Sequence, residues 1–428
     1  MPTVLLSLAL VLTLIGCSGS PARLDSLEGR WGGVANAGPT PTKATVDFAQ
    51  DSEGRLGARL SVPDERLLSK PLINVRYHSP DVHFDLKTSE RVISFDGVRQ
   101  GRVISGFMTG EARTPLRLEY AGSAPLTPYA QEEVRFSSGD VLLAGTLLLP
   151  NTQGRHPAVI LIHGSSTPNR DDFRFYGDLF ARHGIAALIY DKRDEGSGRD
   201  GVSRVDLREL ASDALAAVAM LRTRGDINPQ QIGLWGHSQG GWVAPIAAAQ
   251  STDVAFVISF SGPGMTYAEV NKFADATRLR HQGFSESEVR EAARVLDMVD
   301  EYVRSGGDRQ QLQMFLDIAW SKPWAAQTTL PRRVPSVDQI HTWLRWRNLD
   351  LDPVLYWKQV KVPVLVLFGE LDDVVPVSAS VSRIEEALRW SGNKDVTIKV
   401  YPKASHTIQP APDFLPTMVD WLRLRVTI

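Results

Sequence analysis

The sequence predicts an α/β protein with a doubly wound, mostly parallel sheet and a helical cap insertion, preceded by a small N-terminal all-β domain. Three observations lead to this class. From about residue 133, continuous apolar runs alternate with amphipathic stretches, which is typical of buried parallel strands and their crossover helices. Earlier residues form only short, partly alternating segments broken by Gly, Asp, Ser and Pro. Between residues 266 and 357 long helical patterns replace the alternation.

Composition sets broad limits on the class of protein. The 428 residues suffice for two or three domains, and the contents of 43% hydrophobic and 22% charged residues are ordinary for a globular protein. The formal net charge is −2 and the chain has no long basic run, so we expect no nucleic-acid partner.

The N-terminus predicts a lipoprotein signal peptide over residues 1–17. Val4 to Ile15 is an apolar run of twelve residues, which suits a secretory signal and is short for a membrane span. The following Leu14-Ile15-Gly16-Cys17 resembles a bacterial lipobox, although Met1-Pro2-Thr3 supplies no basic residue. Cys17 is the only cysteine, so we expect it to be lipidated and exclude an intramolecular disulfide. An ordinary signal peptide or an N-terminal anchor is the alternative.

The residue after the cysteine bears on location. Ser18 in this position resembles the sorting pattern for the outer membrane. We therefore expect a lipid-anchored protein of the bacterial cell envelope, facing the periplasm from the outer membrane in a Gram-negative organism.

Residues 24–122 are predicted to form the small all-β domain, as a barrel or a sandwich. Segments such as KATVDFAQ, RLGARLSV and RVISFDGV are strand-like, and no long helical pattern occurs among them. The opening LEGRWGG is predicted to be a strand with Trp31 buried. His78 and His83 have no metal-ligand spacing and are interpreted as structural. An Ala- and Pro-rich linker, AGSAPLTPYA, follows.

Residues 130–265 and 358–428 are predicted to form the α/β domain. EEVRFSSGDVLLAGTLLLP indicates a hairpin that turns at Ser138-Gly139-Asp140. The strands and helices that follow are PAVILIHG, the helix DDFRFYGDLFARHG ending at Gly184, IAALIYD, the helix VDLRELASDALAAVAMLRTRG ending near Gly225, IGLWG and VAFVISFSG. After the cap come the strand VPVLVLFG, a helix around ASVSRIEEALRWSG, the strand VTIKVYP and the helix DFLPTMVDWLRL.

Residues 266–357 are predicted to be the helical cap. An insertion at this point should lie over the carboxyl ends of the strands, where open α/β sheets bind ligands. Most of its tryptophans are expected in the core of the cap and one or two against substrate. They are Trp320, Trp324, Trp343, Trp346 and Trp357. Its glutamates are interpreted as solvated helix faces; they are Glu269, Glu286, Glu288, Glu291 and Glu301.

A Gly-x-Ser-x-Gly motif, Gly236-His237-Ser238-Gln239-Gly240, lies between a predicted strand and a predicted helix. A sharp turn there projects the serine hydroxyl from the top of the sheet, and the glycines avoid a collision with the neighbouring strand and helix. The N-terminus of the helix favours negative charge that develops beside the serine. Ser238 is therefore the predicted nucleophile.

A serine nucleophile needs a base, an acid that orients the base, and donors for the oxyanion. His406 follows the last predicted strand and is the predicted base, because the other candidates, His163, His183 and His237, are less suitably placed. Asp372 and Asp373 follow the penultimate strand, so either completes the chain order Ser, Asp, His.

Two backbone N–H groups are expected to form the oxyanion hole. One is that of Gln239, which directly follows the nucleophile. The other is expected from Ser165, because Gly164 lets the backbone approach closely.

Five segments together resemble the α/β-hydrolase superfamily: LIHGS, YDKRDEGSG at Tyr190 to Gly198, IGLWGHSQGG, GELDDVVP and ASH. The resemblance is to serine hydrolases of the dienelactone-hydrolase and prolyl-oligopeptidase-like branch, in particular bacterial esterases with a small N-terminal β-domain. It covers nearly the whole chain after the signal. One departure is Asp194-Glu195, which stands where these esterases usually have glycine after the arginine.

The resemblance implies hydrolysis of a small-molecule carboxylic ester through an acyl-enzyme, without a metal or an organic cofactor. The family pattern Gly-x-x-Asp-x-x-Val-Pro aligns with Gly369, Asp372, Val375 and Pro376, which selects Asp372 as the acid. Asp373 is then expected to bond local backbone N–H groups of the turn.

Other functions stay open at this point. A peptidase or aminopeptidase uses the same machinery, whereas a dehalogenase on this fold would need Asp at position 238. A binding lipoprotein on an inactive hydrolase fold is the alternative that is not an enzyme.

Overall fold

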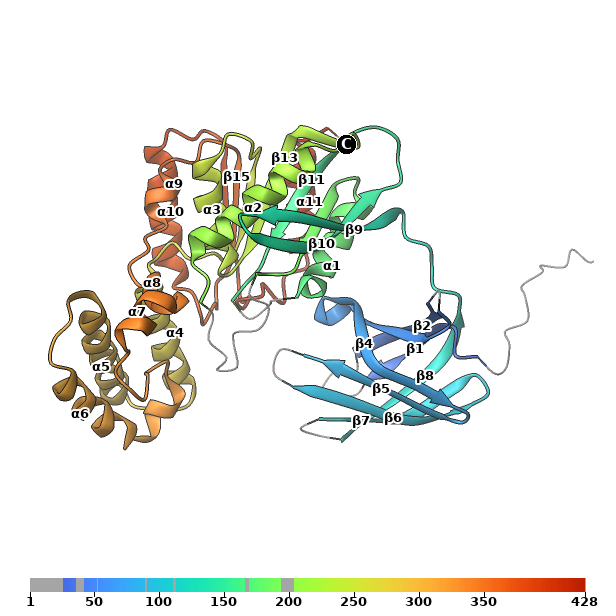
Figure 1. Cartoon of the computed structure of the whole chain (residues 1–428), viewed down its shortest axis with the longest axis horizontal. Coiled ribbons are helices and arrows are strands. Elements are labelled where there is room, and N and C mark those ends of the chain that lie inside the picture. The colour runs from blue at the N-terminus through green and yellow to red at the C-terminus, as the bar shows by residue number, and fades with distance from the viewer. Residues whose placement is uncertain are drawn as a thin grey trace, which may run out of the picture. The chain divides into compact units, whose positions relative to one another are not determined.

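The computed structural model describes residues 26–35, 42–51, 53–88, 91–110, 113–165, 169–193 and 204–427 (Figure 1). The chain divides into two units: Met1–Arg59 with Leu72–Ala124, and Leu60–Pro71 with Pro125–Ile428. The predicted lipidation residue Cys17 and the pair Asp194-Glu195 lie outside the described residues. In the described ranges, no helix combines the length and apolar character that crossing a bilayer requires.

The N-terminal domain is a closed barrel of eight strands in chain order, which confirms the predicted all-β domain. The strands are β1 (Gly29–Ala35), β2 (Thr42–Gln50), β3 (Leu56–Val62), β4 (Leu67–His78), β5 (Asp81–Lys87), β6 (Val92–Gln100), β7 (Val103–Thr109) and β8 (Arg113–Gly122). β1 pairs antiparallel with both β2 and β8, and this closure removes the free edges of the sheet. Trp31, as predicted, is buried in the core, together with Phe84 and Phe95.

The second domain contains an eight-stranded sheet in the order β16-β15-β14-β13-β11-β12-β10-β9. β9 (Tyr129–Ser138) and β10 (Val141–Pro150) form the predicted antiparallel hairpin, with Gly139 in its turn at a φ of 59°. The other strands run parallel to one another: β11 (His156–Ile162), β12 (Ala186–Tyr190), β13 (Ile227–His237), β14 (Val257–Phe260), β15 (Val364–Gly369) and β16 (Val396–Tyr401). Every residue of β11, β12, β14 and β15 is buried, which explains their continuous apolar runs.

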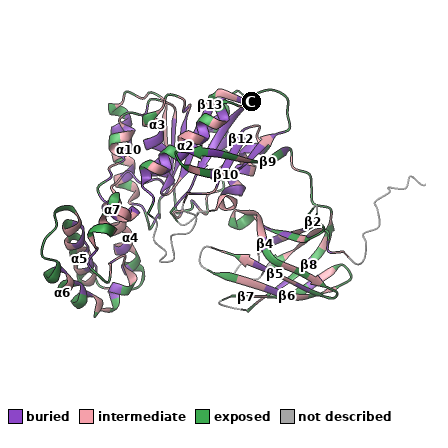
Figure 2. Cartoon of the chain, viewed as in Figure 1, coloured by how far each residue is buried: buried purple, intermediate pink, exposed green. Residues whose placement is uncertain are grey.

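Helices cover both faces of this sheet, as a doubly wound fold requires (Figures 1 and 2). One face packs against α2 (Leu207–Arg222), α3 (Gly240–Gln250), α9 (Val354–Trp357) and α10 (Val377–Trp390). The other packs against α1 (Arg174–Arg182) and α11 (Phe414–Arg423). The helix predicted from Asp171 begins as a 3₁₀ helix, η2 (Arg170–Phe173), because the Asn169 side chain caps the backbone N–H of Asp171.

The cap consists of the helices between β14 and α9. They are α4 (Tyr267–His281), α5 (Glu286–Ser305), α6 (Arg309–Trp320), η3 (Pro323–Gln327), α7 (Val337–Thr342) and α8 (Leu344–Arg347). Capping boxes at Thr266 and Ser285 explain where α4 and α5 begin. A separate apolar core holds these helices together.

The tryptophans of the cap segment separate into two groups. Trp324 and Trp346 are buried in the core of the cap, and Trp320 and Trp343 pack against that core. Trp357 is fully buried in the cluster that joins α9 to the sheet. Its assignment to the cap is therefore wrong, because α9 already packs on the α/β domain.

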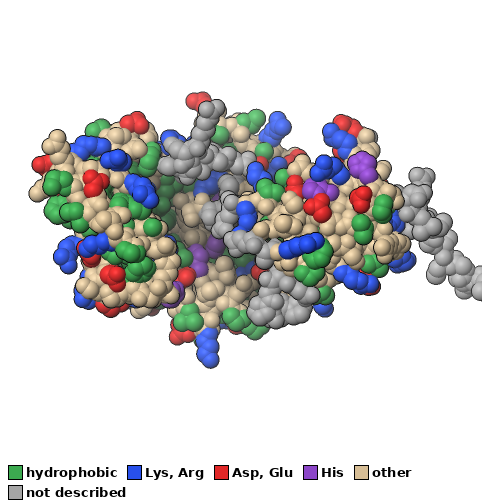
Figure 3. Space-filling model, turned by 90° about the horizontal axis from the view of Figure 1, so that it is seen from below, with side chains coloured by type: hydrophobic (Ala, Val, Ile, Leu, Met, Phe, Trp, Pro, Cys, Tyr) green, Lys and Arg blue, Asp and Glu red, His purple; other side chains and the backbone are tan. Residues whose placement is uncertain are grey.

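The surface of the cap mixes apolar and charged groups. Met314, Phe315 and Ile318 of α6 are exposed. Figure 3 shows hydrophobic side chains between Lys and Arg side chains over the cap, at the left of the view.

Candidate active site

The predicted nucleophile occupies a strained turn. Ser238 directly follows β13 and has a φ of 53°, in the left-handed region that side chains other than glycine rarely adopt. Its N–H donates to the carbonyl of Phe260 at 2.9 Å, and its carbonyl accepts from the N–H of Gly241 at 2.8 Å. These bonds hold the turn between β14 and α3, as a nucleophile elbow requires.

Close backbone contacts explain the glycines around the serine. A Cβ at Gly236 would lie 2.2 Å from the carbonyl oxygen of Gly240, and one at Gly240 would lie 2.5 Å from that of Ile162. A Cβ at Gly241 would lie 2.2 Å from the Cα of Gly262. Any side chain at these positions would collide with the neighbouring strand or loop, as the motif predicts.

Asp372 and His406 lie together at the carboxyl edge of the sheet. Nδ1 of His406 is 2.7 Å from Oδ2 of Asp372, whose side chain is fully buried. The other carboxylate oxygen, Oδ1, accepts from the N–H of Val374 at 2.9 Å and from that of Val375 at 2.8 Å. The turn therefore fixes the carboxylate and leaves one of its oxygens for the imidazole.

The expectation for Asp373 is wrong. Its side chain is exposed, and in the ranges that the structure describes it has no hydrogen-bond partner. Asp372 instead bonds the N–H groups two and three residues ahead, a geometry that a short acidic side chain at the start of a turn readily adopts.

His406 lies close to the nucleophile elbow. Oγ of Ser261 donates to the carbonyl of His406 at 2.8 Å, which ties the loop after β16 to the end of β14. The ring centroid of His406 is 5.4 Å from that of His237, the residue before Ser238. Among the described residues no hydrogen bond joins Oγ of Ser238 to His406. The predicted acid thus contacts the predicted base, whereas in the described residues the predicted base and nucleophile are not bonded to each other. In free enzymes this second contact often tightens only with substrate.

The other histidines are unsuited to serve as the base. Burial lowers the pKa of the His163 and His237 imidazoles to about 3, so both are neutral at pH 7. Nε2 of His163 donates to the carbonyl of Tyr190. His237 packs its ring 4.4 Å from that of Phe260. His183 is held through Nδ1, which is 2.7 Å from the carbonyl oxygen of Leu179 in its own helix.

The two predicted oxyanion donors are free. Ser165 follows β11, and Gln239 is the N-cap residue of α3. Within the described part of the chain, neither backbone N–H donates to a protein acceptor. The amino end of α3 adds partial positive charge at the same place. A developing oxyanion beside Ser238 would find unused donors here.

The predicted active-site residues lie within a part of the chain that matches a known protein family. The profile of the alpha/beta hydrolase family matches residues 159–415, more than half of the chain. The chain belongs to the α/β-hydrolase family. The matched residues include Ser165, Ser238, Asp372 and His406.

This α/β hydrolase is similar to two curated proteins and to a solved structure of a peptidase. It is 31% identical over 134 residues to the quorum-quenching protein AidA of Acinetobacter baumannii, which is 31% of this chain and 44% of AidA. It is 24% identical over 337 residues to Esterase EstD of Thermotoga maritima, covering 76% of this chain and 70% of EstD. The match thus spans less than half the length of AidA. A solved structure of Pyrococcus horikoshii acylaminoacyl peptidase aligns with a TM-score of 0.49 and 15% identity, over 90% of this chain and 62% of the peptidase.

Lys192 was not among the site residues predicted from the sequence, yet it contacts two of the segments that carry them. It follows β12, is 7% exposed, and donates from Nζ to the carbonyl of Gly164 at 3.0 Å and to Oε1 of Gln239 at 2.5 Å. Burial lowers the pKa of its ammonium to about 8. Its position directly after a buried strand at the same edge of the sheet was the available signal. Arg193, its neighbour, pairs instead with the buried Asp213 of α2.

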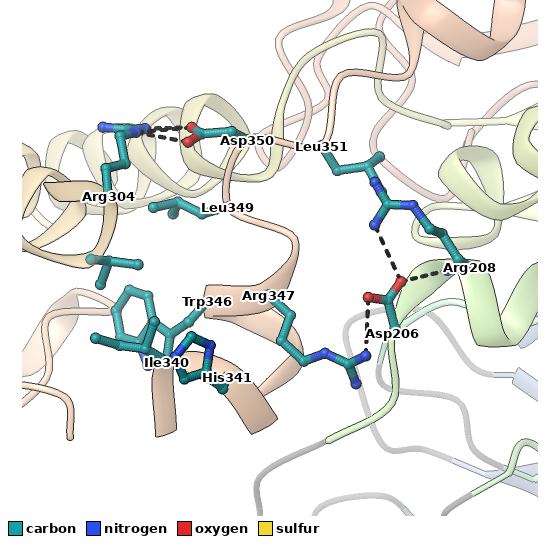
Figure 4. A pocket seen from close by; sticks show the side chains of 11 residues that line it. Asp206, Arg208, Arg304, Ile340, His341, Trp346, Arg347, Leu349, Asp350 and Leu351 are labelled. Carbon is teal, nitrogen blue, oxygen red and sulfur yellow. Dashed lines mark hydrogen bonds and ion pairs between the residues drawn. The ribbon is translucent and has the colours of Figure 1, made fainter. Parts of the chain in front are cut away.

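A cavity of about 500 Å³ lies between the cap and the start of α2 (Figure 4). Its charged side chains are paired with one another: Arg304 with Asp350 at 2.6 Å, and Arg347 with Asp206 at 3.4 Å. Ser238, Asp372 and His406 are absent from its lining. This cavity therefore does not contain the catalytic residues that the sequence predicts.

In the ranges that the structure describes, no group of three or more His, Cys, Asp or Glu side chains is arranged to hold a metal ion. In the barrel, Nδ1 of His83 is 2.7 Å from Oδ1 of Asp96, and its Nε2 is 3.3 Å from Oδ1 of Asp85. His83 thus has contacts that suit the structural role predicted for it.

Proposed function

We propose that this α/β hydrolase cleaves carboxylic esters of small molecules, with Ser238 as nucleophile, His406 as general base and acid, and Asp372 as the orienting carboxylate. The observation that carries the proposal is the 2.7 Å contact between His406 and Asp372 beside the strained turn of Ser238. The similarity to a protein named Esterase EstD supports an ester as the substrate class.

Acylation begins with the tautomer of His406. Because Asp372 accepts the hydrogen on Nδ1, Nε2 carries none and can take the proton of Ser238. Oγ of Ser238 then attacks the ester carbonyl. The N–H groups of Ser165 and Gln239 hold the resulting oxyanion, and each such donor contributes about 10²–10³ in rate. His406 returns the proton to the leaving alcohol, and the acyl group stays on Ser238.

Deacylation repeats the cycle with water. His406 removes a proton from a water molecule, whose oxygen attacks the acyl carbonyl. The same two N–H groups hold the second oxyanion. Its collapse releases the carboxylic acid and returns the proton to Ser238.

The contacts of the cap glutamates favour esters over substrates with a free amino terminus. An aminopeptidase needs acidic groups for that amine, and each cap glutamate already has a partner. Glu269 and Glu288 complete capping boxes, Glu286 pairs with Arg280, Glu291 with Lys322, and Glu301 accepts from Ser305. These contacts suit the helix-face role expected for them.

Labelling with a fluorophosphonate probe, followed by kinetics, tests the proposal. We expect one label at Ser238 and faster turnover of nitrophenyl esters than of aminoacyl anilides. Ser238→Ala should lose both label and turnover, whereas Ser212→Ala, on the exposed surface of α2, should keep both. Preferred cleavage of the anilides would favour a peptidase, and an unlabelled wild type without turnover would favour the inactive binding lipoprotein.

We also propose that Cys17 is lipidated and anchors the hydrolase in the cell envelope, at the periplasmic face of the outer membrane in a Gram-negative organism. The single cysteine after an apolar run of twelve residues supports this. Two or more acyl chains suffice for stable anchoring. We expect the Cys17→Ser variant to be lost from the membrane fraction and to show altered processing of its N-terminal signal. A variant that stays in the membrane fraction with unchanged processing would exclude the anchor.

A further inference from the structure

Lys192 is a buried lysine whose ammonium bonds two neutral acceptors. Nζ donates to the carbonyl of Gly164 at 3.0 Å and to Oε1 of Gln239 at 2.5 Å, and the residue is 7% exposed. Burying an ammonium is unfavourable, so a buried lysine with such partners needs an explanation. The sequence places Lys192 after β12, whereas its two acceptors follow β11 and β13.

The first acceptor belongs to the same peptide unit as an oxyanion donor. The carbonyl of Gly164 and the N–H of Ser165 share one planar peptide bond, and in a trans peptide the two groups point in opposite directions. A bond from Lys192 to that carbonyl therefore directs the Ser165 N–H away from Lys192. The positive charge also polarises the peptide, which strengthens the N–H as a donor.

The second acceptor belongs to the residue that carries the other donor. Gln239 supplies the backbone N–H next to Ser238, and its side chain is held by the same ammonium. Gln239 is 3% exposed, so this side chain has little freedom once bonded. One buried cation thus ties the loop after β11 to the start of α3.

We propose that Lys192 is a positioning residue that aligns the two oxyanion N–H groups, of Ser165 and Gln239, and places positive charge behind them. This inference rests on the proposed ester hydrolysis at Ser238. Because the oxyanion forms only during reaction, Lys192 should affect the transition state more than the bound substrate.

Lys192→Met tests this role, since it keeps an unbranched side chain of nearly the same length and removes the charge. We expect kcat per fluorophosphonate-labelled site to fall about 10–100-fold. This decrease should not exceed the one that follows complete removal of an oxyanion donor. KM should change less than threefold. A boronic acid, which adds to Ser238 and places a negative oxygen in the oxyanion hole, should bind more weakly by a factor similar to that in kcat. A purely structural role would reduce the labelled fraction without changing kcat per labelled site or boronate affinity.

Two further variants complete the design. Lys399→Met is the matched control and should keep wild-type kinetics, because Lys399 is a half-buried lysine of β16 whose Nζ pairs with Asp413. Gln239→Met removes one acceptor while keeping the backbone N–H. At constant KM, kcat of Gln239→Met should fall less than kcat of Lys192→Met. The fold-decrease in kcat of the double variant should be smaller than the product of the two single fold-decreases, because the two side chains are in contact. If Lys192→Met does not fold, Gln239→Met becomes the test. A kcat of Gln239→Met equal to that of the wild type would then overturn the inference.

The possible failures are distinct. A wild type that neither takes the fluorophosphonate label nor hydrolyses esters contradicts the proposed function itself. A labelled, active wild type whose Lys192→Met variant has the same kcat and the same boronate affinity contradicts only the role of Lys192.

Discussion

Replacing Asp372 by Asn tests whether this carboxylate sets the tautomer of His406. In the native site Oδ1 accepts from the N–H groups of Val374 and Val375, and Oδ2 lies 2.7 Å from Nδ1 of His406. An Asn side chain has nearly the same size but offers one acceptor oxygen and one NH₂ donor. It keeps the two turn bonds only when its oxygen faces Val374 and Val375. Its NH₂ group then faces His406.

This orientation imposes the wrong tautomer on the base. Nδ1 of His406 must accept from the amide, so the ring hydrogen moves to Nε2, the atom that should receive the proton of Ser238. In a related triad the same substitution lowers kcat about 10⁴-fold. The opposite orientation preserves the histidine bond but sets the NH₂ against two N–H donors, and each donor left unsatisfied costs about 1–3 kcal/mol. We therefore expect a loss of rate at nearly native stability.

Turnover of nitrophenyl acetate and thermal unfolding measure the two effects separately. Asp373→Asn is the matched control, because Asp373 is adjacent, exposed and without a hydrogen-bond partner in the described ranges. It should keep kcat and Tm close to wild type. The reasoning is refuted if Asp372→Asn retains kcat within tenfold of wild type, or if Asp373→Asn loses as much. A lowered Tm with intact kcat would mean that the amide adopts the opposite orientation.

Three other predictions concern stability and turnover. Stability should fall as pH drops below about 6.5, because His163 and His237 have folded pKa values of about 3 and the unfolded chain binds their protons first. At pH 5 each histidine should contribute a loss of about 2 kcal/mol. Urea unfolding at pH 7 and pH 5 measures this, and a His237→Phe variant with the wild-type pH dependence would contradict it. Gly241→Ala should lose stability and turnover together, because its Cβ would lie 2.2 Å from a backbone carbon; a variant with native Tm and kcat would disprove that contact. Trp324→Ala should cost about 3–5 kcal/mol, because Trp324 is buried in the cap core; an unchanged free energy of unfolding would speak against this role.

The sequence by itself determined the class of fold and predicted the position of the nucleophile. Parallel strands that are buried on both faces have continuous apolar runs in the sequence. For this reason β11, β12, β14 and β15 could be predicted from the sequence alone. The turn at Ser238 was equally visible, because its close backbone contacts admit only glycine at Gly236 and Gly240. Such features leave a short, local pattern in the sequence, even where, as at Gly240, the contact that requires glycine is made with a distant residue.

Only the tertiary structure decided which side chains meet across the sheet. From the residues alone Asp372 and Asp373 were equivalent, and only the family pattern selected Asp372. The turn after β15 gives the physical difference, because it buries Asp372 against His406 and exposes Asp373. Trp357 was misplaced because a helical pattern does not reveal which core receives the helix. Lys192 was missed because its partners lie 28 and 47 residues away, on loops that the strand order β13-β11-β12 brings together. Contacts of this kind are set by the order of strands in the sheet, which the periodicity of a single sequence does not encode.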